Sequence, residues 1–247
     1  MATPLPWSYS AISSVDSCPH KHLEVKVLKH FVDESGEAAQ WGTYVHKCIE
    51  DAVTIGTAMP ENTKTYAPQV WAAIGGDLKF ALAEKKLAIN SKFEPVPWAD
   101  RWGGSISDIL KVMGPEALVV DWKLGKVKPS DQLKVNAVMV FLNYPEVDVV
   151  HTSFEWLAHG GGRCACCKGL PVSTKAVYWR YELPELWASI MPKLKQYAQC
   201  FKTDTWQMRP SGLCKNYCVV NTCQHCGQYV GKNIRSVLAW LIHQKER

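Results

Sequence analysis

The sequence predicts a mixed α/β fold with a cysteine-rich appendage. Segments with helical periodicity alternate along the chain with short β-rich runs. The 247 residues are 47% hydrophobic, which is enough to bury one sizeable core. Ten cysteines are present, and four of them gather near the C-terminus. We expect one domain over 1–247, with a core over about 38–205 and a cysteine-rich lobe formed by about 8–30 and 206–247.

The elements of the first half follow from local patterns. The first thirty residues predict short helices, which are broken at Cys18-Pro19. Residues 38–55 predict a helix with one apolar face, and residues 69–88 predict a second helix that Gly75-Gly76 weakens in its middle.

The second half begins with two expected strands. Residues 105–112 alternate and residues 118–122 are β-rich, and the segment 113–116 between them is suited to a hairpin turn. Further elements are expected as follows: a helix over 129–142, strands over 147–157 and 176–183 that flank a long loop, a helix over 186–201 with a kink or restart at Pro192, and a final helix over 230–243.

An acid and a base end the second of these strands, in Asp121-Trp122-Lys123. Side chains alternate across a strand, so Asp121 and Lys123 are expected on one face and Trp122 on the other. Asp108 lies in the preceding strand, and a hairpin would bring it near Asp121. Two carboxylates form a hard-oxygen site suited to Mg²⁺ or Mn²⁺. Such a metal can polarise a phosphate and activate water, while Lys123 assists activation or neutralises negative charge.

The order of these residues resembles a known family. Gly42-xxx-His46, Asp108, Asp121-Trp122-Lys123 and Gln132 are similar to the motif set of the RecB-like branch of PD-(D/E)xK nucleases, which includes the CRISPR-adaptation exonucleases and many phage exonucleases. The resemblance extends from Ser10 to Cys226. It implies a restriction-endonuclease-like core, in which a central mixed sheet is flanked by helices and joined to a cysteine-rich metal-binding lobe. It also implies a Mg²⁺- or Mn²⁺-dependent DNA exonuclease. His46, Asp108, Asp121 and the backbone carbonyl of Trp122 would bind the metal, and Asp108, Asp121, Lys123 and Gln132 would be catalytic.

The C-terminal cysteines are spaced as Cys214-xxx-Cys218-xxxx-Cys223-xx-Cys226. Four dense thiols in a cytosolic chain indicate a metal site, but this spacing fits either zinc or an iron–sulfur cluster. The family resemblance implies a [4Fe-4S] cluster held by Cys18, Cys214, Cys218 and Cys223, with Cys226 spare. The alternative is a Zn²⁺ site formed by Cys214, Cys218, Cys223 and Cys226.

The other cysteines lead to less specific expectations. Cys164, Cys166 and Cys167 lie in a glycine-rich segment that could bind a second metal or form a loop facing DNA. Cys48 and Cys200 fall in helical segments with apolar neighbours, and we expect them to be buried.

The formal net charge of +5 suits a polyanionic partner, and DNA ends or single strands are the expected substrate. Trp98 and Trp102 could stack on unpaired bases. A structure-specific endonuclease and an inactive, metal-stapled DNA-binding module remain alternatives. The start MATPLPWSYS has no signal-peptide pattern, and the longest apolar runs are too short for a bilayer. We therefore expect a cytoplasmic protein with no membrane association, acting in recombination, repair or DNA degradation in a bacterium or phage-infected host.

Overall fold

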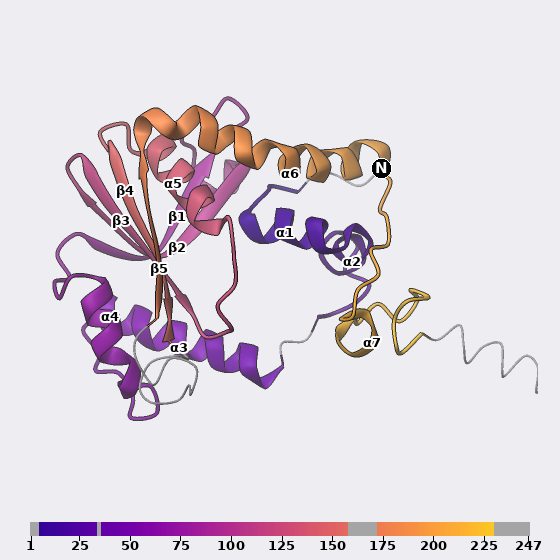
Figure 1. The fold of residues 1–247 in the computed structure, drawn as a ribbon, viewed down its shortest axis with the longest axis horizontal. Coiled ribbons are helices and arrows are strands. Elements are labelled where there is room, and N and C mark those ends of the chain that lie inside the picture. Colours follow the sequence, from indigo (N-terminus) through magenta and orange to yellow (C-terminus); the bar gives the residue numbers. More distant parts are fainter. Residues whose placement is uncertain (1–4, 34–35, 158–171, 230–247) are drawn as a thin grey trace, which may run out of the picture. The chain divides into compact units, whose positions relative to one another are not determined.

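The computed structural model describes residues 5–33, 36–157 and 172–229 (Figure 1). The chain divides into two compact units. The larger comprises Pro6–Tyr9 and Ser35–Pro192, and the smaller comprises Met1–Leu5, Ser10–Glu34 and Lys193–Arg247. Within the described ranges, no helix has both the length and the apolar character needed to cross a membrane.

A five-stranded sheet forms the centre of the larger unit, with its strands in the order β1-β2-β3-β4-β5. Neighbouring strands are antiparallel except β3 and β4, which are parallel. A parallel pair needs a crossover connection, and α5 (Gln132–Asn143) lies between these two strands in the chain. The mixed α/β class is therefore confirmed. The strands are β1 (Ala81–Ile89), β2 (Gly103–Met113), β3 (Glu116–Lys123), β4 (Val149–Trp156) and β5 (Ser173–Trp179).

Helices cover both faces of this sheet (Figure 1). On one face, α3 (Glu37–Thr54) and α4 (Ala67–Ala73) contribute to a buried apolar cluster that includes Ile49 and Val120. On the other face lies α5, in which eight of twelve residues are buried. Short 3₁₀ turns connect the elements at Lys64–Tyr66, Trp98–Asp100 and Arg180–Glu182.

Several predicted elements are confirmed. The helix over 38–55 is α3, and the strands over 105–112 and 118–122 are β2 and β3. The turn between them pairs Met113 with Glu116, and Gly114 adopts a φ of 65° there. Such a φ is accessible to glycine without steric cost, which explains why the chain can reverse at this point.

The helix predicted over 69–88 is wrong. α4 ends at Ala73, and Ala81–Ile89 forms strand β1. Gly75 and Gly76 have φ values of 77° and 68°, which a helix cannot accommodate. Exposure then alternates along the first part of β1, as it does in a strand that is buried on one face only.

The remaining elements differ from prediction mainly at their ends. The helix expected from residue 129 begins at Gln132, and the strand expected over 176–183 is β5, which ends at Trp179. α6 (Leu183–Thr203) is a single helix that contains Pro192, so no restart occurs there. The helix predicted over 230–243 lies outside the described residues.

The smaller unit contains short helices, as the sequence predicts for the N-terminal residues. α1 (Tyr9–Ser17) ends before Cys18, whose extended backbone begins α2 (Pro19–His22). A π-helical turn follows at Leu23–Val27, and α7 (Cys214–Tyr217) lies in the cysteine-rich segment. The expected break at Cys18-Pro19 is confirmed.

Candidate active site

The ladder between β2 and β3 stops next to two carboxylates. Its last pair is Ile109 with Val120, and the next residue on each strand is Asp108 or Asp121. The Trp122 amide donates a hydrogen bond to Asp108 Oδ2 at 2.7 Å. Asp108 therefore satisfies a backbone donor that a continued ladder would have paired with a strand carbonyl.

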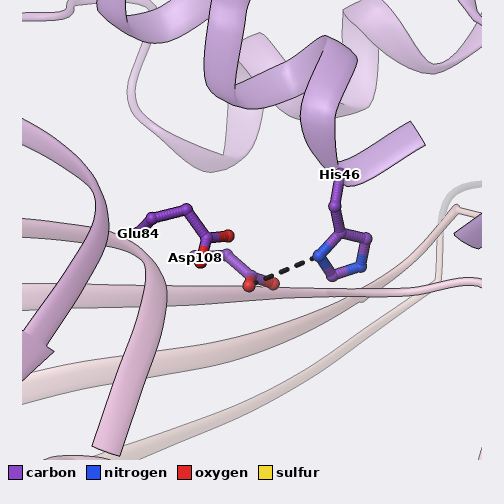
Figure 2. Close-up of side chains that lie close together, drawn as sticks. All are labelled: His46, Glu84 and Asp108. Carbon is purple, nitrogen blue, oxygen red and sulfur yellow. Dashed lines mark ion pairs between the residues drawn. The ribbon is translucent and has the colours of Figure 1, made fainter. Parts of the chain in front are cut away.

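His46 reaches Asp108 from α3. Val45 and Ile49, on either side of it in the sequence, are fully buried and anchor this helix on the sheet. His46 Nδ1 lies 3.4 Å from Asp108 Oδ1. A dashed line marks this pair in Figure 2. Burial alone would lower the pKa of His46, but the hydrogen bond to Asp108 and the charges of Asp108 and Asp121 outweigh it and raise that pKa.

Glu84 joins this pair from β1. The pairs Ala83 with Ile109 and Lys85 with Ser107 place Glu84 opposite Asp108. Ligand atoms of His46, Glu84 and Asp108 all lie within 4.8 Å of one another, so this group could hold a metal ion (Figure 2). Burial and the nearby charges of Asp108 and Glu50 raise the pKa of Glu84.

Asp121 is directed to two other side chains. It is 2% exposed, and its Oδ1 accepts a hydrogen bond from Gln132 Nε2 at 2.6 Å. Its Oδ2 forms an ion pair with Lys123 Nζ. Burial and then the charge of Asp108 raise the pKa of Asp121 to about 7, although Lys123 opposes the shift.

Trp122 lies between Asp121 and Lys123 in β3, and its amide is bonded to Asp108. Its ring is 2% exposed and belongs to the buried cluster under α3 and α4. The ammonium group of Lys123 lies 5.0 Å from the centre of the Phe154 ring on β4. The structure thus connects His46 to Asp108, and Asp121 to Lys123 and Gln132, with the Trp122 amide bonded to the first carboxylate.

Sequence reasoning missed Glu84. The segment was predicted as a helix, in which Glu84 would have had no defined relation to Asp108. Residue types do not alternate along Ala81–Ile89, so no local signal marked this strand, and both its alternating exposure and its pairing with β2 follow from the three-dimensional structure.

Four cysteines of the smaller unit line a common pocket. Cys18, Cys214, Cys218 and Cys223 all line it, together with Met208 and other residues. Backbone amides donate to two of the sulfur atoms, from Lys21 to Cys18 at 3.5 Å and from Ser211 to Cys214 at 3.3 Å.

The fifth candidate, Cys226, has a different contact. It is 1% exposed, and its thiol donates to the Cys218 carbonyl oxygen at 3.1 Å. Cys48 and Cys200 are buried, as predicted. The segment with Cys164, Cys166 and Cys167 lies outside the described residues.

Comparisons with known proteins found little. No protein-family model matches this chain. No curated protein matches it either. Among solved structures, it is similar to a protein from Eubacterium rectale that carries the provisional name of an exonuclease, with a TM-score of 0.46 and 14% identity, over 84% of this chain and 91% of that one. A likeness this distant does not indicate an activity.

Proposed function

We propose that this protein is a divalent-metal-dependent nuclease of the PD-(D/E)xK type that hydrolyses DNA, and that it acts as an exonuclease. The observation that carries the proposal is the meeting of Asp108 and Asp121 at the end of the β2–β3 ladder, with His46 on the first and Lys123 on the second. Carboxylates and an imidazole can hold a divalent metal that assists phosphodiester hydrolysis, and an ammonium group can stabilise the negative charge that develops.

The donor set fits a divalent cation. His46, Glu84 and Asp108 bring their ligand atoms within 4.8 Å of one another, and Asp121 feels the charge of Asp108. The pKa values of Glu84 and Asp121 are raised. Repulsion among anions contributes to both shifts, and a cation would relieve it. We assign His46, Glu84 and Asp108 to the metal, with Asp121 and the Trp122 carbonyl as further ligands. Carboxylate oxygens with one imidazole suit Mn²⁺ or Mg²⁺, which would supply Lewis-acid chemistry at the phosphate.

The protein's own groups would hold and move charge around the reaction. Lys123 Nζ can neutralise negative charge that develops on the phosphate, or in its neutral form accept a proton from the attacking water. Gln132 fixes the orientation of the Asp121 carboxylate through Oδ1. The Trp122 amide does the same for Asp108, so neither carboxylate depends on solvent for its position.

A digestion assay tests the proposal. With linear DNA and Mn²⁺ or Mg²⁺, we expect cleavage that stops with EDTA. Asp121→Asn and Lys123→Met should each lower the rate by about 100-fold or more, the usual cost of losing a charge-stabilising group. Lys134→Met is the matched control, because Lys134 forms an ion pair with the surface residue Asp131 at 3.2 Å. Wild-type cleavage by Asp121→Asn would refute the assignment.

The same assay separates the two modes of cleavage. An exonuclease leaves closed circular strands intact and shortens end-labelled linear strands progressively. Nicking or opening of circles would instead indicate the endonuclease alternative with the same site. Binding of DNA without any cleavage, with either metal, would indicate the inactive DNA-binding module.

We also propose that Cys18, Cys214, Cys218 and Cys223 hold a [4Fe-4S] cluster. The shared pocket supports these four, and Cys226 is occupied by its bond to the Cys218 carbonyl. In a tetrahedral zinc site the sulfurs lie about 3.8 Å apart, given a Zn–S distance of about 2.3 Å. Among the described cysteines, no three sulfurs lie within 4.8 Å of one another, which favours the larger cluster.

Metal analysis of protein purified without air tests this assignment. We expect brown protein with about four irons per chain, lost in Cys223→Ser and retained in Cys226→Ser. Stoichiometric zinc in colourless protein, lost in both variants, would establish the zinc site instead.

A further inference from the structure

Exposed apolar side chains flank the edge strand β1, on which the candidate ligand Glu84 lies. Phe80, which precedes the strand, is 58% exposed, and Phe93, in the turn that follows it, is 41% exposed. Trp102, at the start of β2, is 38% exposed and contacts Phe93 with ring centres 6.0 Å apart. Large apolar side chains that remain exposed beside a polar site commonly mark a binding surface.

Cations on β1 and in the segments on either side of it lie over aromatic rings. Lys79 Nζ is 5.0 Å from the centre of the Phe80 ring. Lys86 Nζ and the Arg101 guanidinium carbon are 5.8 Å and 4.0 Å from the Trp98 ring centre. Rings interleaved with cations match a single nucleic-acid strand, whose bases stack on aromatic faces while its phosphates meet positive charge.

Two of these aromatic residues are held in an unusual backbone conformation. Phe80 and Phe93 have φ values of 62° and 67°, which bulky residues seldom adopt. The turn that presents Phe93 is fixed by Asn90, whose side-chain oxygen accepts from the amides of Lys92 at 2.8 Å and Glu94 at 3.1 Å. Backbone strain of this kind is concentrated at functional sites.

The position of Glu84 makes this surface continuous with the active site. Glu84 lies on β1 between Lys86 and Phe80, which precedes the strand. At about 3.3 Å per residue, Phe80 and Lys86 are about 20 Å apart. Lys86 pairs with Ile106, two residues from Asp108 on β2. A strand several nucleotides long could therefore contact both ends of β1 with a phosphate near the carboxylates.

We infer that β1 and its flanking turns, with Phe80, Lys86, Phe93, Trp98, Arg101 and Trp102, form a binding surface for single-stranded DNA that leads into the active site. The inference rests on the proposed nuclease function for its substrate. Stacking on these rings requires unpaired bases and tolerates any base, so duplex DNA should bind this surface poorly and sequence should matter little.

Binding without cleavage tests the inference. We would titrate the protein into fluorescein-labelled oligothymidylate in EDTA and follow anisotropy. Phe80→Asn and Phe93→Asn should each weaken binding by about 5-fold or more, since one lost stacking contact has at least that effect; asparagine is chosen because it tolerates positive φ. Tyr181→Asn is the control, because Tyr181 is 74% exposed but follows β5 at the opposite edge of the sheet.

A second variant does not alter apolar packing. Lys86→Gln should reduce the slope of log affinity against log salt by about 0.7, the value for one phosphate contact on a single strand. The inference would be overturned if both phenylalanine variants bound the oligonucleotide with wild-type affinity, or if Tyr181→Asn lost as much affinity as they do. It would also be overturned if the wild type bound duplex DNA equally tightly or bound no single-stranded DNA. If these variants lose binding while the wild type cleaves no DNA, the binding surface stands and the nuclease proposal fails.

Discussion

Replacement of Glu84 by glutamine should change stability and metal binding in opposite directions. The ligand atoms of Glu84 and Asp108 lie within 4.8 Å, where two like charges repel by about 1 kcal/mol in water and about 3.5 kcal/mol at an effective dielectric of 20. Glu84 is partly exposed, so the lower value applies. In EDTA, Glu84→Gln should therefore raise the free energy of unfolding by about 1 kcal/mol.

In the presence of metal, Glu84→Gln should no longer be more stable than the wild type. Loss of a group outside the ligand shell costs 10- to 100-fold in metal affinity, so loss of a ligand should cost about tenfold or more. At a Mn²⁺ concentration about 100 times the wild-type Kd, the wild type gains about 2.7 kcal/mol and a tenfold weaker variant about 1.4 kcal/mol. The two proteins should then be about equally stable.

Urea unfolding in EDTA and in Mn²⁺, together with calorimetric titration of Mn²⁺, measures both effects. Glu50→Gln is the control, since Glu50 is also a nearby anion but forms an ion pair with Lys47 Nζ at 3.0 Å. It should leave the Mn²⁺ affinity within about twofold, because it removes no ligand. The reasoning is refuted if Glu84→Gln is no more stable than the wild type in EDTA and gains as much from Mn²⁺.

Three further predictions concern stability. A Cβ at Gly227 would overlap the Lys215 carbonyl oxygen, so Gly227→Ala should lower the free energy of unfolding by about 2 kcal/mol or more, measured by urea titration. His22 is 2% exposed, and burial lowers its pKa from 6.5 to about 4. The free energy of unfolding should therefore be highest, as far as His22 contributes, above pH 6.5 and should fall by up to about 3 kcal/mol as the pH drops to 4. In His22→Phe the free energy of unfolding should lack this part of the pH dependence. Lys111 is 5% exposed and donates to two carbonyls that follow α4, at 2.9 and 3.0 Å, so Lys111→Met should cost about 2–3 kcal/mol in thermal unfolding, whereas Lys92→Met on the surface should be neutral.

Local patterns predicted those parts of the fold that local forces decide. The apolar face of α3, the alternation in β2, the β-rich run in β3 and the reversal at Gly114 are each visible within a few residues. The helix expected over 69–88 failed because two glycines in left-handed conformation end α4. The apolar residues of 69–88 therefore belong to a short helix and a separate edge strand, and composition alone does not show where one becomes the other.

Some residues of the candidate site could likewise be placed from the sequence and others could not. Asp108, Asp121 and Lys123 could be placed on strands from the sequence, and a hairpin implies that the two acids approach. Glu84 could not be placed, because its position depends on pairing β1 with β2 across an intervening turn and on its own φ of 48°. The contact of the Cys226 thiol with a carbonyl was equally invisible, since the cysteine spacing treats Cys223 and Cys226 alike.

The end of the β2–β3 ladder explains why this position can carry a charged site. Where strands stop pairing, backbone donors lose their partners, and a buried unpaired amide is costly. Asp108 satisfies the Trp122 amide with Oδ2, while its Oδ1 faces His46. Oδ2 thus pairs the amide at the end of the ladder, and Oδ1 is left for His46 and a metal ion. The hydrogen bond from the Trp122 amide holds the carboxylate in a fixed position. A carboxylate on a mobile loop would lose conformational entropy on binding a cation, whereas Asp108 has lost that entropy when the sheet forms.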